Sequence, residues 1–213
     1  MVIKFDHITF ACPMDYNYMN IIPQGYIIDY MEKNLENIPC KLPLLSNKQS
    51  VHDLIFLSKE NSIPIEITKY KVCNNTHTKN IQLQSKHTGG GYFVEYYVKD
   101  VTKSQRFFES FGFKVAELYE QKIEMSMKPI LDKAINIKLI NAQDTTNNFL
   151  DDFGFVSLAF FVDSIHKEIS KIKEKDYKIT EINPLKVNGK NLNIGFVYGD
   201  NGEIIELIEL KKE

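Results

Sequence analysis

The stretch that decides the fold is Gly199-Asp200-Asn201-Gly202-Glu203-Ile204-Ile205-Glu206-Leu207-Ile208-Glu209-Leu210, in which a turn signal leads into an apolar segment that carries a carboxylate. Asn201-Gly202 suits the positive φ angles of a tight hairpin, and the β-branched residues after it predict a strand. Side chains alternate across a strand, so Glu206 shares a face with Ile204 and Ile208, where an ionised carboxylate is costly unless paired, hydrated or bound to metal. The alternative is an edge-strand carboxylate that reaches water, and the pattern alone does not separate the two.

A complete structural unit ends with this stretch. Residues 156 to 162 read as a strand, and Asp163 or Ser164 can cap a helix whose Ile165, Ile169 and Ile172 fall on one face. Three more strands are expected over residues 177–182, 192–198 and 203–210. The predicted order is therefore β-α-β-β-β.

The same order occurs upstream. A strand is predicted over 92–98, followed by a helix that Asp100 or Thr102 can cap and that Gly112 can end. Three strands are again expected, over 113–119, 123–127 and 135–140. A segment of this length repeated in tandem indicates an α+β fold built from βαβββ modules.

Residues 91 to 212 resemble the vicinal oxygen chelate superfamily, which includes glyoxalases, bleomycin and fosfomycin resistance proteins and extradiol dioxygenases. The matching segments are Val98-Lys99-Asp100-Val101, Phe107-Phe108-Glu109-Ser110-Phe111-Gly112-Phe113, and residues 196 to 207. The N-terminal third resembles one more module. Phe5-Asp6-His7-Ile8-Thr9-Phe10 looks like its first strand and Ile63-Pro64-Ile65-Glu66-Ile67-Thr68 like its last, while the helix between them is poorly marked.

The resemblance implies tandem βαβββ modules that form cup-shaped mixed sheets. We expect an N-terminal module over 1–72, a linker over 73–90, and paired modules over 91–213, comprising 91–142 and 155–212. Three modules leave the first without a partner in this scheme. We therefore expect a homodimer in which a second chain covers the open edge of that module.

In the family, a metal is held by residues on the first and last strands of the participating modules. Position by position, the resemblance implies His7, Glu66 and Glu206 as ligands of a divalent metal such as Zn, Fe, Mn or Ni. Phe93 and Ser157 stand where a first-strand His is common, so the site departs from the family pattern there.

Two further residues are candidates to complete a site around His7 and Glu66. His52 begins a predicted strand, and Glu95 shares a strand face with Phe93 and Tyr97, where an aromatic cavity could raise its pKa and make it a catalytic base. Each candidate has a structural alternative: His7 as a satisfied core imidazole, Glu66 as a solvated carboxylate, and His52 as a solvent-capped strand entry.

Composition limits the function classes. A net charge of -2 and a single arginine, Arg106, argue against nucleic acid and against phosphate recognition by guanidinium groups. The sequence shows no membrane-spanning run and three cysteines without ligand spacing, so we expect a cytoplasmic protein with reduced thiols.

The leading hypothesis is a metal-assisted isomerase, lyase or dioxygenase acting on a small, partly apolar organic molecule. The alternative is a non-catalytic protein that binds small molecules or sequesters an antibiotic.

Overall fold

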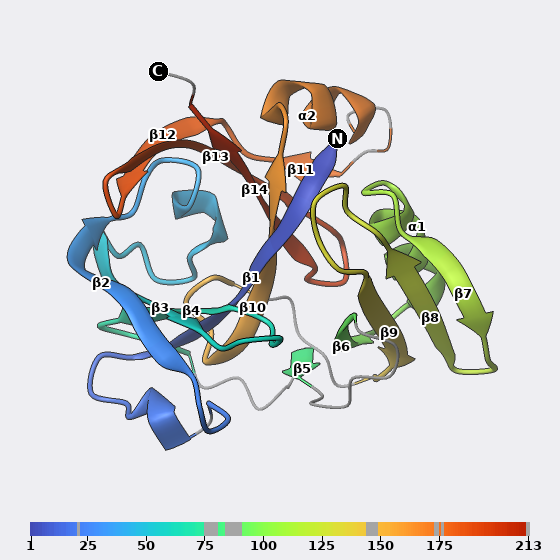
Figure 1. Cartoon of the computed structure of the whole chain (residues 1–213), viewed down its shortest axis with the longest axis horizontal. Coiled ribbons are helices and arrows are strands. Elements are labelled where there is room, and N and C mark those ends of the chain that lie inside the picture. Colours follow the sequence, from blue (N-terminus) through green and yellow to red (C-terminus); the bar gives the residue numbers. More distant parts are fainter. Residues whose placement is uncertain are drawn as a thin grey trace.

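The structure, a computed structural model, describes residues 1–20, 22–74, 91–143, 149–172, 175 and 177–211, together with the backbone of 81–83. Two mixed sheets and two α-helices make up these residues, which confirms the α+β class (Figure 1). The nine-stranded sheet contains β1 (Val2–Pro13), β2 (Ile27–Glu36), β3 (Val51–Ser58), β4 (Ile65–Tyr70), β10 (Gly154–Val162), β11 (Lys178–Ile179), β12 (Asn183–Val187), β13 (Lys190–Tyr198) and β14 (Ile204–Leu210). The five-stranded sheet contains β5 (Ile81–Leu83), β6 (Tyr92–Val98), β7 (Lys114–Leu118), β8 (Lys122–Met127) and β9 (Ile135–Asn141).

The helices are α1 (Val101–Glu109) and α2 (Ile165–Ile172), with 3-10 turns η1 (Tyr18–Asn20) and η2 (Leu42–Leu44). Asp100 caps α1 by accepting a hydrogen bond from the Lys103 backbone N–H, and Gly112 adopts a φ of 91° just beyond its end. Neither these helices nor any other in the described ranges has the length and apolar character that a membrane span requires.

Three units repeat one strand arrangement. In each, the first strand lies parallel to the last, as β1 with β4, β6 with β9, and β10 with β14. The second and third units carry the expected helix after their first strand. In the first unit, η1 and strand β2 stand in its place, and the sequence reading of this unit did not include β2.

The units do not pair as the sequence suggested. Antiparallel pairing of β1 with β10 joins the first and third units in the nine-stranded sheet, whereas residues 91–142 form the other sheet with β5. The edge of β10 that faces away from β14 is thus occupied by β1. Residues 91–142 and 155–212 therefore do not share the cup-shaped sheet that the sequence had led us to expect. The second unit, not the first, is the one that has no partner unit in its sheet.

Strand β12 was also missed by the sequence reading. It forms a hairpin with β13 through Asn188 and Gly189, whose φ angles of 46° and 72° are typical of the tight turns that suit twisted hairpins. An Asn-Gly pair between two short segments was the signal available for this turn.

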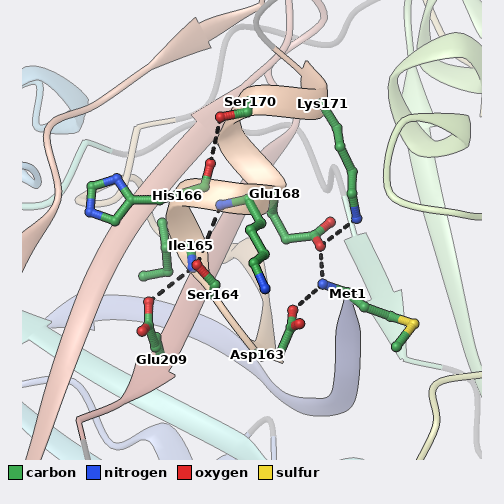
Figure 2. Close-up of polar contacts among 10 residues, drawn as sticks. Met1, Asp163, Ser164, Ile165, His166, Glu168, Ser170, Lys171 and Glu209 are labelled. Atoms are coloured by element: carbon green, nitrogen blue, oxygen red, sulfur yellow. Dashed lines mark hydrogen bonds and ion pairs between the residues drawn. The ribbon is translucent and has the colours of Figure 1, made fainter.

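Helix α2 is fixed at its first turn by charged groups (Figure 2). Ser164 accepts a hydrogen bond from the Lys167 backbone N–H at 3.4 Å, and Glu209 accepts one from the Ile165 backbone N–H at 2.9 Å. The amino group of Met1 forms ion pairs with Asp163 and with the buried Glu168. These contacts hold the start of β1 against α2.

Aromatic side chains join the two sheets on the face that carries the helices. Phe160 of β10 is fully buried, with its ring 5.3 Å from that of Phe5 and 6.2 Å from that of Phe113, which lies beside the five-stranded sheet. The opposite face of the nine-stranded sheet is therefore the one left to form a site.

Replacing Phe160 with alanine should lower the free energy of unfolding by about 3–5 kcal/mol, because the removed ring leaves a cavity at the junction of the two sheets. Urea denaturation measures the loss. The control Leu118→Ala removes a side chain that is 69% exposed and should change stability by less than about 0.5 kcal/mol. Equal effects of the two substitutions would contradict the packing described.

Candidate metal centre

A shift in strand register turns two neighbouring residues of β1 toward the same side. Side chains normally alternate, but the pairing of β1 with β10 shifts between Phe5 and His7. Phe5 packs in the core with Phe160, whereas Asp6 and His7 both line a cavity on the other face. The carboxylate of Asp6 and the imidazole of His7 therefore both face this cavity.

Two carboxylates are placed symmetrically on either side of His7. On the parallel pair β1–β4, Glu66 lies opposite Thr9, and on the parallel pair β10–β14, Glu206 lies opposite Ala159. Both glutamates sit on the last strand of their unit and next to its first strand. The pairing of β1 with β10 then brings the two last strands to either side of a common centre.

His7, Glu66 and Glu206 are brought together as a buried cluster. Each offers a ligand atom within 4.8 Å of those of the other two. The Nε2 atom of His7 lies 3.7 Å from Oε2 of Glu66 and 3.8 Å from Oε2 of Glu206, which is too long for a hydrogen bond. The three side chains surround a space rather than bonding to one another.

The imidazole of His7 is held in position from its other side. Its Nδ1 atom lies 2.9 Å from Oδ2 of Asp6, and its ring meets that of Phe56 edge-on at 5.5 Å. A carboxylate that binds one ring nitrogen fixes the ring orientation and aims the second nitrogen, as is usual for metal-bound histidines. Asp6 therefore directs Nε2 of His7 toward the two glutamates.

Burial and neighbouring charges shift the pKa values of the cluster residues. Burial raises the pKa of Glu206 to about 7, and the negative charge of Glu66 acts in the same direction. Burial alone would lower the pKa of His7, but the charge of Glu66 and the hydrogen bond to Asp6 outweigh it and raise the pKa to about 9. Glu66 and Glu206 thus repel each other, and a cation between them is favoured.

The residues fit a divalent metal. Nε2 of His7 is buried and, within the described part of the chain, has no hydrogen-bond partner. One imidazole nitrogen and two carboxylate oxygens form a donor set that suits Zn, Fe, Mn or Ni, and three protein ligands leave a coordination position open. His7 and Glu66 are therefore neither a satisfied core imidazole nor a solvated carboxylate.

The cluster lies in a cavity of about 370 Å³ on the inner face of the large sheet. Part of its lining is apolar, with Leu54, Phe56, Phe161, Ile194 and Ile208 among the side chains. A volume of this size with a few convergent polar groups is typical of a site for a small organic molecule.

Ser157 occupies the place of a fourth ligand. It lies opposite Thr9 in the antiparallel pair, two residues before Ala159, just as His7 lies two residues before Thr9. Its side chain is fully buried, and its Oγ has no hydrogen-bond partner among the described residues. A neutral hydroxyl is a weak ligand, so this half of the centre contributes Glu206 alone.

Two other sequence candidates lie elsewhere. Glu95 is on β6 of the five-stranded sheet, where Lys138 pairs with it at 3.0 Å, and it does not line the cavity. The expectation that Glu95 shares a cavity with His7 and Glu66 as a base is therefore wrong, because their strands belong to different sheets.

His52 is fully buried on β3 and stacks on Tyr70 at 5.5 Å. It is not part of the ligand cluster, and burial lowers its pKa well below the ordinary value. His52 is thus neither a third ligand nor solvent-capped.

Asp6 and Lys41, by contrast, line the cavity and were missed by the sequence reading. The only signal for Asp6 was its place next to His7.

The family model of the Glyoxalase/Bleomycin resistance protein/Dioxygenase superfamily matches residues 87–207, more than half of the chain. The chain belongs to this superfamily. The match includes Glu206, whereas His7 and Glu66 lie before it.

Solved structures of the superfamily resemble the chain at low identity. Glyoxalase I from Zea mays is 15% identical, with 96% of this chain and 67% of that chain covered and a TM-score of 0.40. The fosfomycin resistance protein FosX from Listeria monocytogenes, complexed with Mn(II) and sulfate, is 16% identical, with 61% and 93% covered and a TM-score of 0.43. No curated protein matches the chain.

In metal-free protein, Glu206→Gln should raise stability at pH 8.5 and lose this advantage near pH 5. The folded-state pKa of about 7 lies above the ordinary 4.5, so the folded protein holds the proton more tightly than the unfolded chain. The associated stability is full below pH 4.5 and is lost as the pH rises through 7. The gain at pH 8.5 should be on the order of 2 kcal/mol.

Thermal denaturation after treatment with a chelator measures this difference. Glu95→Gln is the matched control, because Glu95 is as buried as Glu206 but is paired with Lys138. That variant should gain no stability at either pH. A Glu206→Gln protein less stable than the wild type at pH 8.5 would show that Glu206 is not a strained group.

Proposed function

We propose that this chain is a metal-dependent enzyme that acts on a small, partly apolar organic molecule, with an isomerase, lyase or dioxygenase type of reaction. The observation that carries the proposal is the buried cluster of His7, Glu66 and Glu206, with ligand atoms within 4.8 Å of one another beside a cavity of about 370 Å³. Membership of the superfamily supports it, because the cluster matches the first-strand and last-strand positions expected to hold metal.

A divalent metal bound by these residues would supply Lewis-acid chemistry and orient an oxygen of the substrate. The protein's own residues have separate tasks. His7, Glu66 and Glu206 would provide ligand atoms from three strands of one sheet, which keeps them rigid. Asp6 would hold the imidazole of His7 in the orientation that leaves Nε2 free, and Phe56 would keep that ring from rotating.

One observation favours a second function. Ser157 stands at the position that corresponds to His7 in the third unit, so the centre has one strong ligand fewer than a fully symmetric pair of units would give. A weaker metal site could serve binding without turnover. The alternative is therefore a protein that binds a small molecule or sequesters an antibiotic in the same cavity.

We also propose that the protein is a homodimer and that it resides in the cytoplasm. Strand β2 ends the nine-stranded sheet and exposes Ile27, Ile28 and Met31, and an open apolar edge is favourable to cover. Light scattering at micromolar concentration should give twice the mass of 24.7 kDa. A monomeric mass at high micromolar concentration would refute the dimer.

The metal-free protein should bind about one equivalent of Zn²⁺ or Mn²⁺, and His7→Ala should weaken the binding by more than about 100-fold. Loss of an outer-shell partner alone costs about 10- to 100-fold, and His7 would be a direct ligand. Isothermal titration calorimetry measures the affinity, and metal analysis of the purified protein gives the stoichiometry.

Two controls separate this site from other metal-binding groups. His166→Ala removes an exposed histidine of α2, and Glu95→Gln removes a buried carboxylate that is paired with Lys138 on the other sheet. Both should leave the affinity within about threefold of wild type, since neither residue belongs to the cluster. Wild-type protein that binds no divalent metal would contradict the enzyme proposal and favour the binding protein.

A further inference from the structure

We propose that Lys41 makes the cavity specific for an anionic ligand: a small organic molecule whose carboxylate or other oxyanion group binds the Lys41 ammonium beside the metal centre. This inference rests on the proposed metal site and adds the charge of the substrate to it. The superfamily resemblance assigns no role to Lys41, which lies outside the strands that carry the ligands.

Lys41 is a buried residue of the connection between β2 and β3, which comprises residues 37 to 50. Figure 1 shows this connection, in light blue, between β2 on one side and β12 and β14 on the other. The Cys40 backbone N–H donates to Oδ1 of Asn183 at 2.7 Å, and the Leu44 carbonyl accepts from the Leu150 backbone N–H at 2.8 Å. The backbone around Lys41 is thus anchored on both sides, against β12 of the third unit and against the segment that precedes β10.

Apolar packing holds the same connection down. Cys40, Leu44 and Leu45 belong to one buried cluster with Ile194 and other residues of the inner sheet face. Lys41 directly precedes the turn η2 between them. Only 4% of the residue is exposed, and it lines the same cavity as His7, Glu66 and Glu206.

The ammonium of Lys41 makes no direct ion pair or hydrogen bond with the described residues. No carboxylate oxygen among them lies within 4.0 Å of it, and its charge acts on Glu206 only through space. Lysine is almost never this buried unless it is paired, because removing an unpaired charge from water is costly. A ligand that enters the cavity is the group that could pair with it.

The net charge of the site predicts the sign of the charge on that ligand. The cavity lining carries four carboxylates and three ammonium groups, namely Asp6, Asp29, Glu66, Glu206, Lys4, Lys41 and Lys190. With a divalent cation and a neutral His7, the site therefore has one net positive charge, and Lys41 is the buried one of the three lysines. Leu54, Phe56 and Phe161 give the same lining an apolar part. The ligand expected is therefore a small organic anion with an apolar part.

Lys41 could instead serve only to balance Glu66 and Glu206, both of which line the cavity with it. In that case its removal would alter metal affinity or folding but not the preference for charged ligands. The two roles therefore differ in a measurement that compares an anion with a neutral molecule of the same shape.

The test uses protein loaded with Mn²⁺ and the probes acetate, methylphosphonate and acetamide, with binding followed by water-proton relaxation. The two anions should bind at least tenfold more tightly than neutral acetamide, since a hydrogen bond to a charged group contributes enough for about such a factor. Lys41→Met should weaken the binding of both anions by at least about tenfold, leave the affinity for acetamide within about threefold, and leave Mn²⁺ affinity unchanged or higher. Lys190→Met, which removes an exposed lysine at the cavity rim, should change anion affinity by less than about threefold.

The outcomes separate this inference from the proposed function. If Mn²⁺ binds and Lys41→Met keeps the wild-type preference for anions, the role of Lys41 is refuted and the metal site stands. If wild-type protein binds no Mn²⁺, the proposed function fails and this inference fails with it. Should Lys41→Met not fold, Lys41→Gln replaces it, and a wild type that binds acetamide as tightly as acetate already refutes the proposal.

Discussion

The antiparallel pairing of β1 with β10 is the interaction on which the rest of the structure depends. It places His7 opposite Ala159 and Thr9 opposite Ser157, and so it fixes the position of β4 relative to β14 across the sheet. A slip of one residue would turn His7 to the opposite face and separate it from both glutamates. The ligand cluster is therefore a product of register between two units far apart in sequence, and neither unit contains it alone.

Part of the centre formed by this register is unfavourable for stability. Glu206 is buried beside the charge of Glu66, which raises its pKa, and Nε2 of His7 is buried without a hydrogen bond within the described chain. Buried groups with shifted pKa values that face a cavity are concentrated at functional sites, because catalysis and binding use such environments. Asp6 and the register shift beside it reinforce this interpretation, since both serve to aim one imidazole nitrogen.

The local content of the units could be predicted from sequence because short-range patterns determine it. Alternation placed Glu206 on the face of Ile204 and Ile208, and all three are buried there. The edge-strand alternative is excluded, since β14 lies between β13 and β10. Helices α1 and α2 follow from their caps and apolar faces.

The remaining features depend on long-range packing that no local pattern encodes. Matching element order identifies a unit but does not say which edges meet, so residues 91–142 were paired with the wrong neighbour and Glu95 was assigned to the wrong cavity. Asp6 faces the site only because of a register shift. Lys41 lies in an irregular connection without periodicity, and only the anchoring of its neighbours reveals that it is buried.

The most direct test of this account is a crystal structure of the protein grown with Mn²⁺ or Zn²⁺, with the ion located by its anomalous scattering. The account predicts one ion within about 2.0–2.2 Å of Nε2 of His7 and of carboxylate oxygens of Glu66 and Glu206. It also predicts that Asp6 keeps its hydrogen bond to Nδ1 of His7. An ion bound elsewhere, with His7 still surrounded by protein atoms alone, would contradict it.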